Sequence, residues 1–296
     1  AILGQFRDVN ATASVERVLR KLASGKAKMI LSKREPRLPS PTFVKAYLDA
    51  FRPKPAPSIG DDAPQGDQTL KRAFEALEAQ DYAHSLSLFQ EALQQGLSTK
   101  ELEAAALNMH GTYMFVMGEA KRALEDLDRS IELCPENVQT WVKKASVHVE
   151  LGDKDAAMAD FDRAVALNAD DADIYYHRGQ VHFILGEFEA AMSDYSKSTS
   201  LDDTFIFSQV QHAVASYKLG NIARSTAEFC RILKKFSDSS ESYNYFGELM
   251  LDQQRHEDAV ANFDKSIALE QAKPKGKNVL PMINKALVLF QWKQDL

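Results

Sequence analysis

The segment DADIYYHRGQVHFILGEFEAAMSDYSKSTSLDDT, residues 171–204, decides the fold because it carries one complete pattern of two helices joined by a turn. The pattern has an early aromatic residue, a small residue where the helices cross, a glycine near the turn, and alanine and an aromatic residue in the second helix. These positions are filled by Tyr175, Gly179, Gly186, Phe188, Ala191 and Tyr195. Small residues let two helices approach closely, and aromatic residues fill the space between units.

The pattern repeats at a spacing of 34 residues in both directions. The small position is held by Gly111, Ala145, Gly179, Ala213 and Gly247, and the turn position by Gly118, Gly152, Gly186 and Gly220. A large apolar residue of the second helix recurs as Leu127, Phe161, Tyr195, Phe229 and Phe263. Because three registers stay in phase, the sequence predicts an all-α tetratricopeptide repeat superhelix, that is, an α-α solenoid.

The repeats predict one elongated body preceded by a connector. We expect connector helices over residues 1–52, a Pro- and Gly-rich linker over 53–66, and the solenoid over 67–296, with about six repeats plus the first helix of a seventh. Ala73 of the first repeat is 38 residues from Gly111, so four extra residues are expected to loop out in QGLSTKEL. The chain stops at Leu296 inside the seventh unit, which predicts a fragment of a longer protein.

Two helices are predicted before the linker. Residues 12–35 form a basic amphipathic pattern, which suits packing on the protein itself or lying on a membrane surface. In LPSPTFVKAYLDAF, residues 38–51, Ser40 can cap a helix and Pro41 suits its first position. The apolar stripe of this short docking helix is Phe43, Ala46, Tyr47, Ala50 and Phe51.

Composition excludes several classes of function. A net charge of -6 gives no field that would attract nucleic acid, and no apolar run is long enough to span a membrane. The two cysteines, Cys134 and Cys230, are far apart in sequence and are expected to be buried thiols in a reducing compartment. His177 and His182 lack the spacing of metal ligands, and no phosphate loop or nucleophile motif is present. We expect no metal, no cofactor and no enzymatic activity.

The binding surface of such a solenoid is lined mainly by the first helix of each unit. The repeat family directs positions 2, 5, 9, 12 and 13 of each unit into the groove, although any one residue there can instead pack on the neighbouring unit. The candidate groove residues are Phe115, Val116, Tyr176, Gln180, Phe183, Ile184, Phe207, Val210, Val214, Tyr217, Glu248, Leu251, Asp252, Leu287 and Phe290. The ionisable groove positions of the second to sixth units are acidic except for Lys218. An apolar groove with an acidic rim suits a helix that is apolar on one side and basic on the other.

Three segments carry a more specific likeness. IYYHRGQVHFILGEFEAAMSDYSKS, LPSPTFVKAYLDAFRPKP and YFGELMLDQQRHEDAVANFDKSIALE together resemble the 70-kilodalton import receptors of the mitochondrial outer membrane, in particular a fungal member. The resemblance implies a connector plus most of a C-terminal repeat domain that receives mitochondrial precursor proteins, with internal signals or amphipathic presequences. It also implies an outer-membrane location facing the cytosol, through an anchor outside this chain.

The partners implied by this resemblance are precursor proteins and presequence peptides, other subunits of the outer-membrane translocase, and heat-shock chaperones that bind a domain missing from this chain. Presequences are Arg-rich, amphipathic and poor in acidic residues, which matches the groove predicted from the residues. The alternative functions are a repeat scaffold that joins folded subunits and a co-chaperone adaptor.

Overall fold

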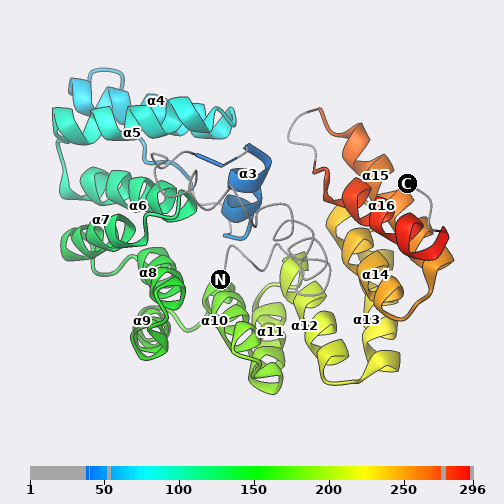
Figure 1. Ribbon diagram of the computed structural model, residues 1–296. Helices are drawn as coiled ribbons and strands as arrows, with labels where there is room; N and C mark the ends of the chain where they lie inside the picture. Colours follow the sequence, from blue (N-terminus) through cyan, green and yellow to red (C-terminus); the bar gives the residue numbers. More distant parts are fainter. Residues whose placement is uncertain (1–37, 40, 52–54, 275–277, 294–296) are drawn as a thin grey trace, which may run out of the picture. The chain divides into compact units, whose positions relative to one another are not determined.

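The computed structural model describes residues 38–39, 41–51, 55–274 and 278–293, and every regular element in them is an α-helix (Figure 1). The expected helix over residues 12–35 lies outside this part. The helices are α3 (Pro41–Asp49), α4 (Gln65–Glu78), α5 (Tyr82–Gln95), α6 (Lys100–Val116), α7 (Ala120–Leu133), α8 (Val138–Glu150), α9 (Lys154–Leu167), α10 (Ala172–Ile184), α11 (Phe188–Leu201), α12 (Ile206–Lys218), α13 (Ile222–Lys235), α14 (Ser240–Asp252), α15 (His256–Ala272) and α16 (Leu280–Lys293). The all-α prediction is therefore confirmed.

The chain divides into two compact units, each described by itself. The first unit, residues 1–184, contains α3, the hairpins α4–α5, α6–α7 and α8–α9, and α10. The second unit, residues 185–296, contains α11, the hairpins α12–α13 and α14–α15, and α16.

Each hairpin closes where a small residue of its first helix meets a large residue of its second. A Cβ atom placed on Gly247 would lie 2.7 Å from the Phe263 ring, and one on Gly111 would lie 3.1 Å from the Asp126 Cβ. The predicted apolar positions of the second helices are all buried: Leu127, Phe161, Tyr195, Phe229 and Phe263, as is Phe89 of the first repeat. The predicted core of the repeats is confirmed.

A polar contact that sequence reasoning missed accompanies this apolar crossing. The Nδ1 atoms of His110, His148 and His212 lie 2.7, 2.8 and 3.0 Å from carboxylate oxygens of the second helix of the same hairpin. Those carboxylates belong to Asp126, Asp160 and Glu228, each directly before the large apolar residue. Asp126, Asp160 and Glu228 follow the 34-residue spacing, so this periodic acidic residue could have predicted the contact.

The turns inside the hairpins need a left-handed backbone. Gly118, Gly152, Gly186 and Gly220 have φ between 76° and 85°, as their position near the turn predicts. In the α4–α5 and α14–α15 turns the same conformation is held by Gln80, with φ of 62°, and Gln254, with φ of 60°. A side chain makes this conformation unfavourable, and these two turns are therefore the strained ones.

The insertion before α6 does not loop out as expected. In QGLSTKEL only residues 96–99 are outside helices, and the remaining residues lengthen α6 to 17 residues, against 13 in α8. The Thr99 hydroxyl accepts a hydrogen bond from the Leu102 N–H and so caps the added turn. The extra residues continue a helix because that satisfies their backbone hydrogen bonds locally.

The expectation for the cysteines is only half right. Cys134 is buried after α7, whereas Cys230 lies on the exposed side of α13. Both are free thiols. Cys230 follows the buried Phe229 and therefore points away from the hairpin core.

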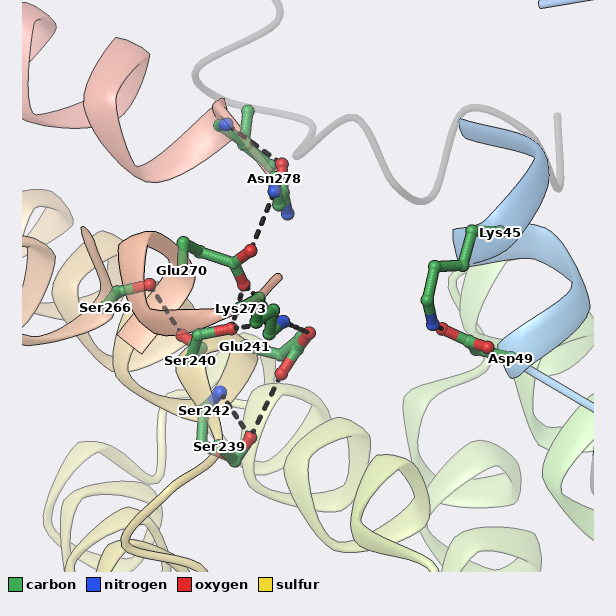
Figure 2. Close-up of polar contacts among 11 residues, drawn as sticks. Lys45, Asp49, Ser239, Ser240, Glu241, Ser242, Ser266, Glu270, Lys273 and Asn278 are labelled. Atoms are coloured by element: carbon green, nitrogen blue, oxygen red, sulfur yellow. Dashed lines mark hydrogen bonds and ion pairs between the residues drawn. The ribbon is translucent and has the colours of Figure 1, made fainter. Parts of the chain in front are cut away.

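A polar cluster fixes the start of α14 to the end of α15 (Figure 2). The buried Glu270 carboxylate accepts hydrogen bonds from the Ser240 hydroxyl, from Lys273 Nζ at 2.6 Å and from the Asn278 N–H at 2.7 Å. Burial alone would raise the pKa of Glu270, but these three donors outweigh it and hold the pKa below its usual value. The Glu270 carboxylate thus holds Asn278, which lies two residues before the start of α16.

We predict that Gln254→Gly stabilises the second unit. Glycine adopts the left-handed turn without steric strain, and the gain is expected to be about 0.5–1 kcal/mol in the free energy of unfolding. Urea unfolding followed by circular dichroism measures it. The matched control is Gly220→Ala, which places a side chain in the same turn one hairpin earlier and should destabilise by a similar amount. A destabilised Gln254→Gly variant would refute the account of these turns.

Candidate functional site

In the first unit, α3 packs against the first helices of the repeats. Val44 and Tyr47 are three residues apart and share one face of α3, and Phe51 lies in the turn two residues beyond the end of the helix; all three are buried. Tyr47 is only 2% exposed, although α3 is a single helix of nine residues. Burial of side chains of this size stabilises docking by about 1.5–3 kcal/mol each.

The residues that hold α3 come from the first helices of three successive repeats, α6, α8 and α10. The Tyr47 ring lies 5.5 Å from the Phe115 ring of α6, and the Phe51 ring stacks on His177 of α10 with 4.1 Å between centroids. Lys143 of α8 places Nζ 5.4 Å from the centre of the Phe51 ring. We call Phe115, Lys143 and His177 the α3 seat. Of the apolar stripe predicted for this docking helix, Tyr47, Ala50 and Phe51 are buried, and Val44 is an additional inward residue. Ser40 and the side chains of Phe43 and Ala46 lie outside the described part of the chain.

Polar groups beneath the seat fix the position of its cation. Lys143 is buried and donates to the Asn108 Oδ1 at 2.6 Å, and the Asn108 amide donates to the Thr140 hydroxyl at 2.8 Å. A cation near an aromatic face is attracted to it, and the attraction strengthens where water is excluded. The seat therefore favours an aromatic residue at the place of Phe51.

Burial at the seat shifts two titrating groups. His177 is 5% exposed, and burial lowers its pKa from 6.5 to about 3, although a hydrogen bond to the Ala50 backbone acts in the opposite direction. Burial raises the pKa of Tyr47 well above its usual value. The docked seat thus holds a neutral imidazole.

The candidate groove residues of the first unit lie in this region. Phe115, Val116, Tyr176 and Gln180 are buried, and Phe183 and Ile184 are half-buried. Phe115 is covered by the ring of Tyr47. Their assignment to a ligand stays a prediction, and Phe115 is accessible to a ligand only after α3 has moved.

The candidates of the second unit are more accessible. Val210 belongs to the hydrophobic core, against which Val214, Tyr217 and Leu251 pack, and Phe207 lies half-buried with its ring 5.5 Å from Phe205. Asp252 is exposed, Leu287 is half-buried, and Phe290 is 51% exposed. We call Leu251, Asp252, Leu287 and Phe290 the α14–α16 surface.

Hydrogen bonds hold the helices of this surface in register. The Tyr217 hydroxyl donates to Asp252 at 2.6 Å, and burial together with this bond raises the pKa of Tyr217 to about 12. Glu248 accepts from the Asn244 amide at 2.7 Å and from the Asn284 amide at 2.6 Å. Glu248, expected as a rim charge, thus joins α14 to α16, whereas Asp252 remains at the surface.

Sequence reasoning missed Lys143 and did not assign His177 to a ligand-facing role. Lys143 stands between the aromatic Trp141 and the small Ala145, where the repeat pattern prescribes no residue type. The structure is needed to see that Lys143 is buried and bonded to Asn108, and this is what marks it as part of the site. Among the described residues no group of three potential metal ligands occurs, and no helix there is long and apolar enough to cross a bilayer.

Comparison with known proteins points to one kind of receptor. A family model for the tetratricopeptide repeat matches residues 142–202. The mitochondrial import receptor subunit TOM70 of Homo sapiens is 27% identical over 318 residues, covering 100% of this chain and 52% of that protein. The Mus musculus protein of the same name is also 27% identical, with 51% of it covered. The crystal structure of the yeast Tom70 aligns with a TM-score of 0.78 at 27% identity, covering 97% of this chain and 61% of that one.

The chain resembles the TOM70 import receptors along its whole length. It spans about half the length of the curated TOM70 relatives named here. The tetratricopeptide solenoid predicted from the 34-residue spacing is confirmed.

We predict that acid releases α3 from its seat. The imidazole of the released state has the ordinary pKa of 6.5, so the released state binds a proton more tightly than the docked state, whose pKa is about 3. Docking is therefore strongest above about pH 6.5 and weakens about tenfold per pH unit below it, or about 30-fold at pH 5. The NMR resonances of the Tyr47 ring report docking.

The control for this prediction is His177→Gln, which keeps a polar side chain but cannot be protonated in this range. It should make docking independent of pH between 5 and 7. Asp171 and Lys143, the charges that also act on His177, are unchanged in this variant. Equal docking of the unsubstituted chain at pH 5 and pH 7 would contradict the prediction.

Proposed function

We propose that this chain is the precursor-binding part of a mitochondrial import receptor. It binds helical segments of precursor proteins on the first helices of its repeats, at the cytosolic face of the outer membrane. The observation that carries the proposal is the seating of an amphipathic helix, α3, on the first helices of the first unit. Similarity to TOM70 over the whole of this chain supports the assignment to mitochondrial import.

For the second unit the proposed ligand is the amphipathic presequence or internal signal of a precursor. The α14–α16 surface presents the exposed ring of Phe290 and the half-buried Leu251 and Leu287, with Asp252 as an exposed carboxylate. A basic, amphipathic helix places apolar residues on such a surface and its cations beside the carboxylate. The apolar contacts supply most of the affinity, and the charge sets orientation and encounter rate.

Other partners follow from the likeness to a receptor subunit. Other subunits of the outer-membrane translocase are proposed to contact the chain, and heat-shock chaperones are proposed to act through a domain outside it. Further ligand contacts are proposed at Tyr176, Gln180, Phe183 and Ile184 of the first unit, and at Phe207 and Val214 of the second.

A second candidate function is a scaffold that joins folded subunits. It is favoured by exposed apolar residues away from the α14–α16 surface, such as Ile222 at 46% exposure on α13. Peptide binding steered by a carboxylate depends on ionic strength, whereas docking of apolar surfaces depends on it little. The two functions therefore differ in a salt titration.

We predict that Phe290→Lys weakens binding of a fluorescent presequence peptide at least about tenfold, because the change removes an apolar contact and repels a basic helix. Fluorescence anisotropy measures the dissociation constant. The matched control is Ile222→Lys, a similarly exposed position on a second helix of the same unit, where no change is expected. Unchanged affinity of the Phe290→Lys chain would refute the assignment of this surface.

We predict that Asp252→Asn slows association of the same peptide several-fold at low salt and flattens its dependence on ionic strength, because the variant loses a steering charge. Stopped-flow fluorescence separates the association and dissociation rates. Asp238→Asn, an equal change of net charge in the exposed segment before α14, is the control. A salt dependence reduced equally by both variants would mean that only net charge matters.

A further inference from the structure

We propose that the α3 seat is a second helix-binding site of this chain. It takes helical segments of other proteins whose inward residues are uncharged and follow the pattern aliphatic, two residues, aromatic, three residues, aromatic. In this structure α3 is the resident occupant, and an external helix binds by displacing it. The inference rests on the proposed function only in taking the ligands to be helical peptide segments.

The pattern is read directly from the occupant. Val44, Tyr47 and Phe51 face the protein, and the latter two contact Phe115 and His177, which lie on different repeats. The charged residues of α3, Lys45 and Asp49, form an ion pair with each other on its outer side (Figure 2). An external segment that is helical up to the first aromatic residue and turns before the second, as this chain does, would make the same contacts.

The seat selects a different chemistry from the α14–α16 surface. Lys143 holds a buried ammonium group 5.4 Å from the centre of the Phe51 ring, so an aromatic residue there is attracted and a basic residue is repelled. Arg-rich presequences therefore fit this site poorly. Uncharged helical segments with aromatic residues fit it well.

Three features keep α3 displaceable. A helix of nine residues is too short to be stable alone, and residues 55–60, which follow it towards α4, form no regular structure. The buried Nε2 atom of His177 has no hydrogen-bond partner among the described residues. A buried polar atom without a partner weakens the docked state. An external helix that presents a hydroxyl or amide to this nitrogen would bind the seat better than α3 does.

The test uses a fluorescent peptide of residues 38–51 as the external helix. In the unsubstituted chain the peptide competes with α3, whereas in a Tyr47→Ala/Phe51→Ala chain the seat is vacant. We expect the double variant to bind the peptide at least about tenfold tighter, because the competing docked state no longer reduces its affinity. The control is Lys45→Ala/Asp49→Ala, which changes two residues on the outer side of the same helix and should leave the affinity at the unsubstituted value.

A second readout follows the seat itself. In the double variant the NMR titration of His177 should move from a pKa of about 3 towards 6.5, and saturating peptide should return it to the low value. If His177 titrates near 6.5 and the peptide still binds no tighter, the seat does not accept an external helix and the inference is wrong. If the pKa of His177 stays near 3, α3 does not cover the seat, which also overturns it.

A final measurement covers a double variant that fails to fold. A peptide with fluorophenylalanine at the place of Phe51, in large excess over the unsubstituted chain, should show a ¹⁹F shift from stacking on His177 that His177→Ala abolishes. No shift overturns the inference. Phe290→Lys should leave binding of the 38–51 peptide unchanged while it weakens presequence binding, so the inference and the proposed function fail separately.

Discussion

The close crossing of two helices in each hairpin is the constraint on which the rest of this structure depends. Gly247 leaves no room for a Cβ beside Phe263, and the same small-against-large contact recurs along the repeats. Because these contacts, together with His–carboxylate pairs in α6–α7, α8–α9 and α12–α13, lie on the facing sides of the hairpins, other sides of the first helices stay available. The surface on which α3 docks is thus a consequence of how the hairpins close.

Much of the fold could be predicted from the sequence because its determinants are local and periodic. The glycine turns, the small crossing residues and the buried second-helix aromatics follow from a single spacing. The insertion before α6 could not be placed, because a loop and an added helical turn satisfy the same residue count. Only the backbone shows that Thr99 caps a longer helix.

The candidate site was predictable in part for a different reason. The apolar stripe of residues 38–51 predicted a docking helix. The α3 seat, however, lies on three repeats distant in sequence, and a pattern within one segment carries no information about contacts with other segments. The same argument explains Glu248: its acidic character was visible, whereas its bonds to Asn244 and Asn284 depend on the packing of α14 against α16.

The central claim is that the first helices of the repeats hold an amphipathic helix that can be exchanged. Amide hydrogen exchange of residues 41–51, with and without a helical precursor segment of the inward pattern, measures this most directly. The account predicts that these amides are protected in the free chain and exchange faster when the segment is added, while α6 and α10 remain protected. Protection of residues 41–51 that does not change with a saturating segment would contradict it.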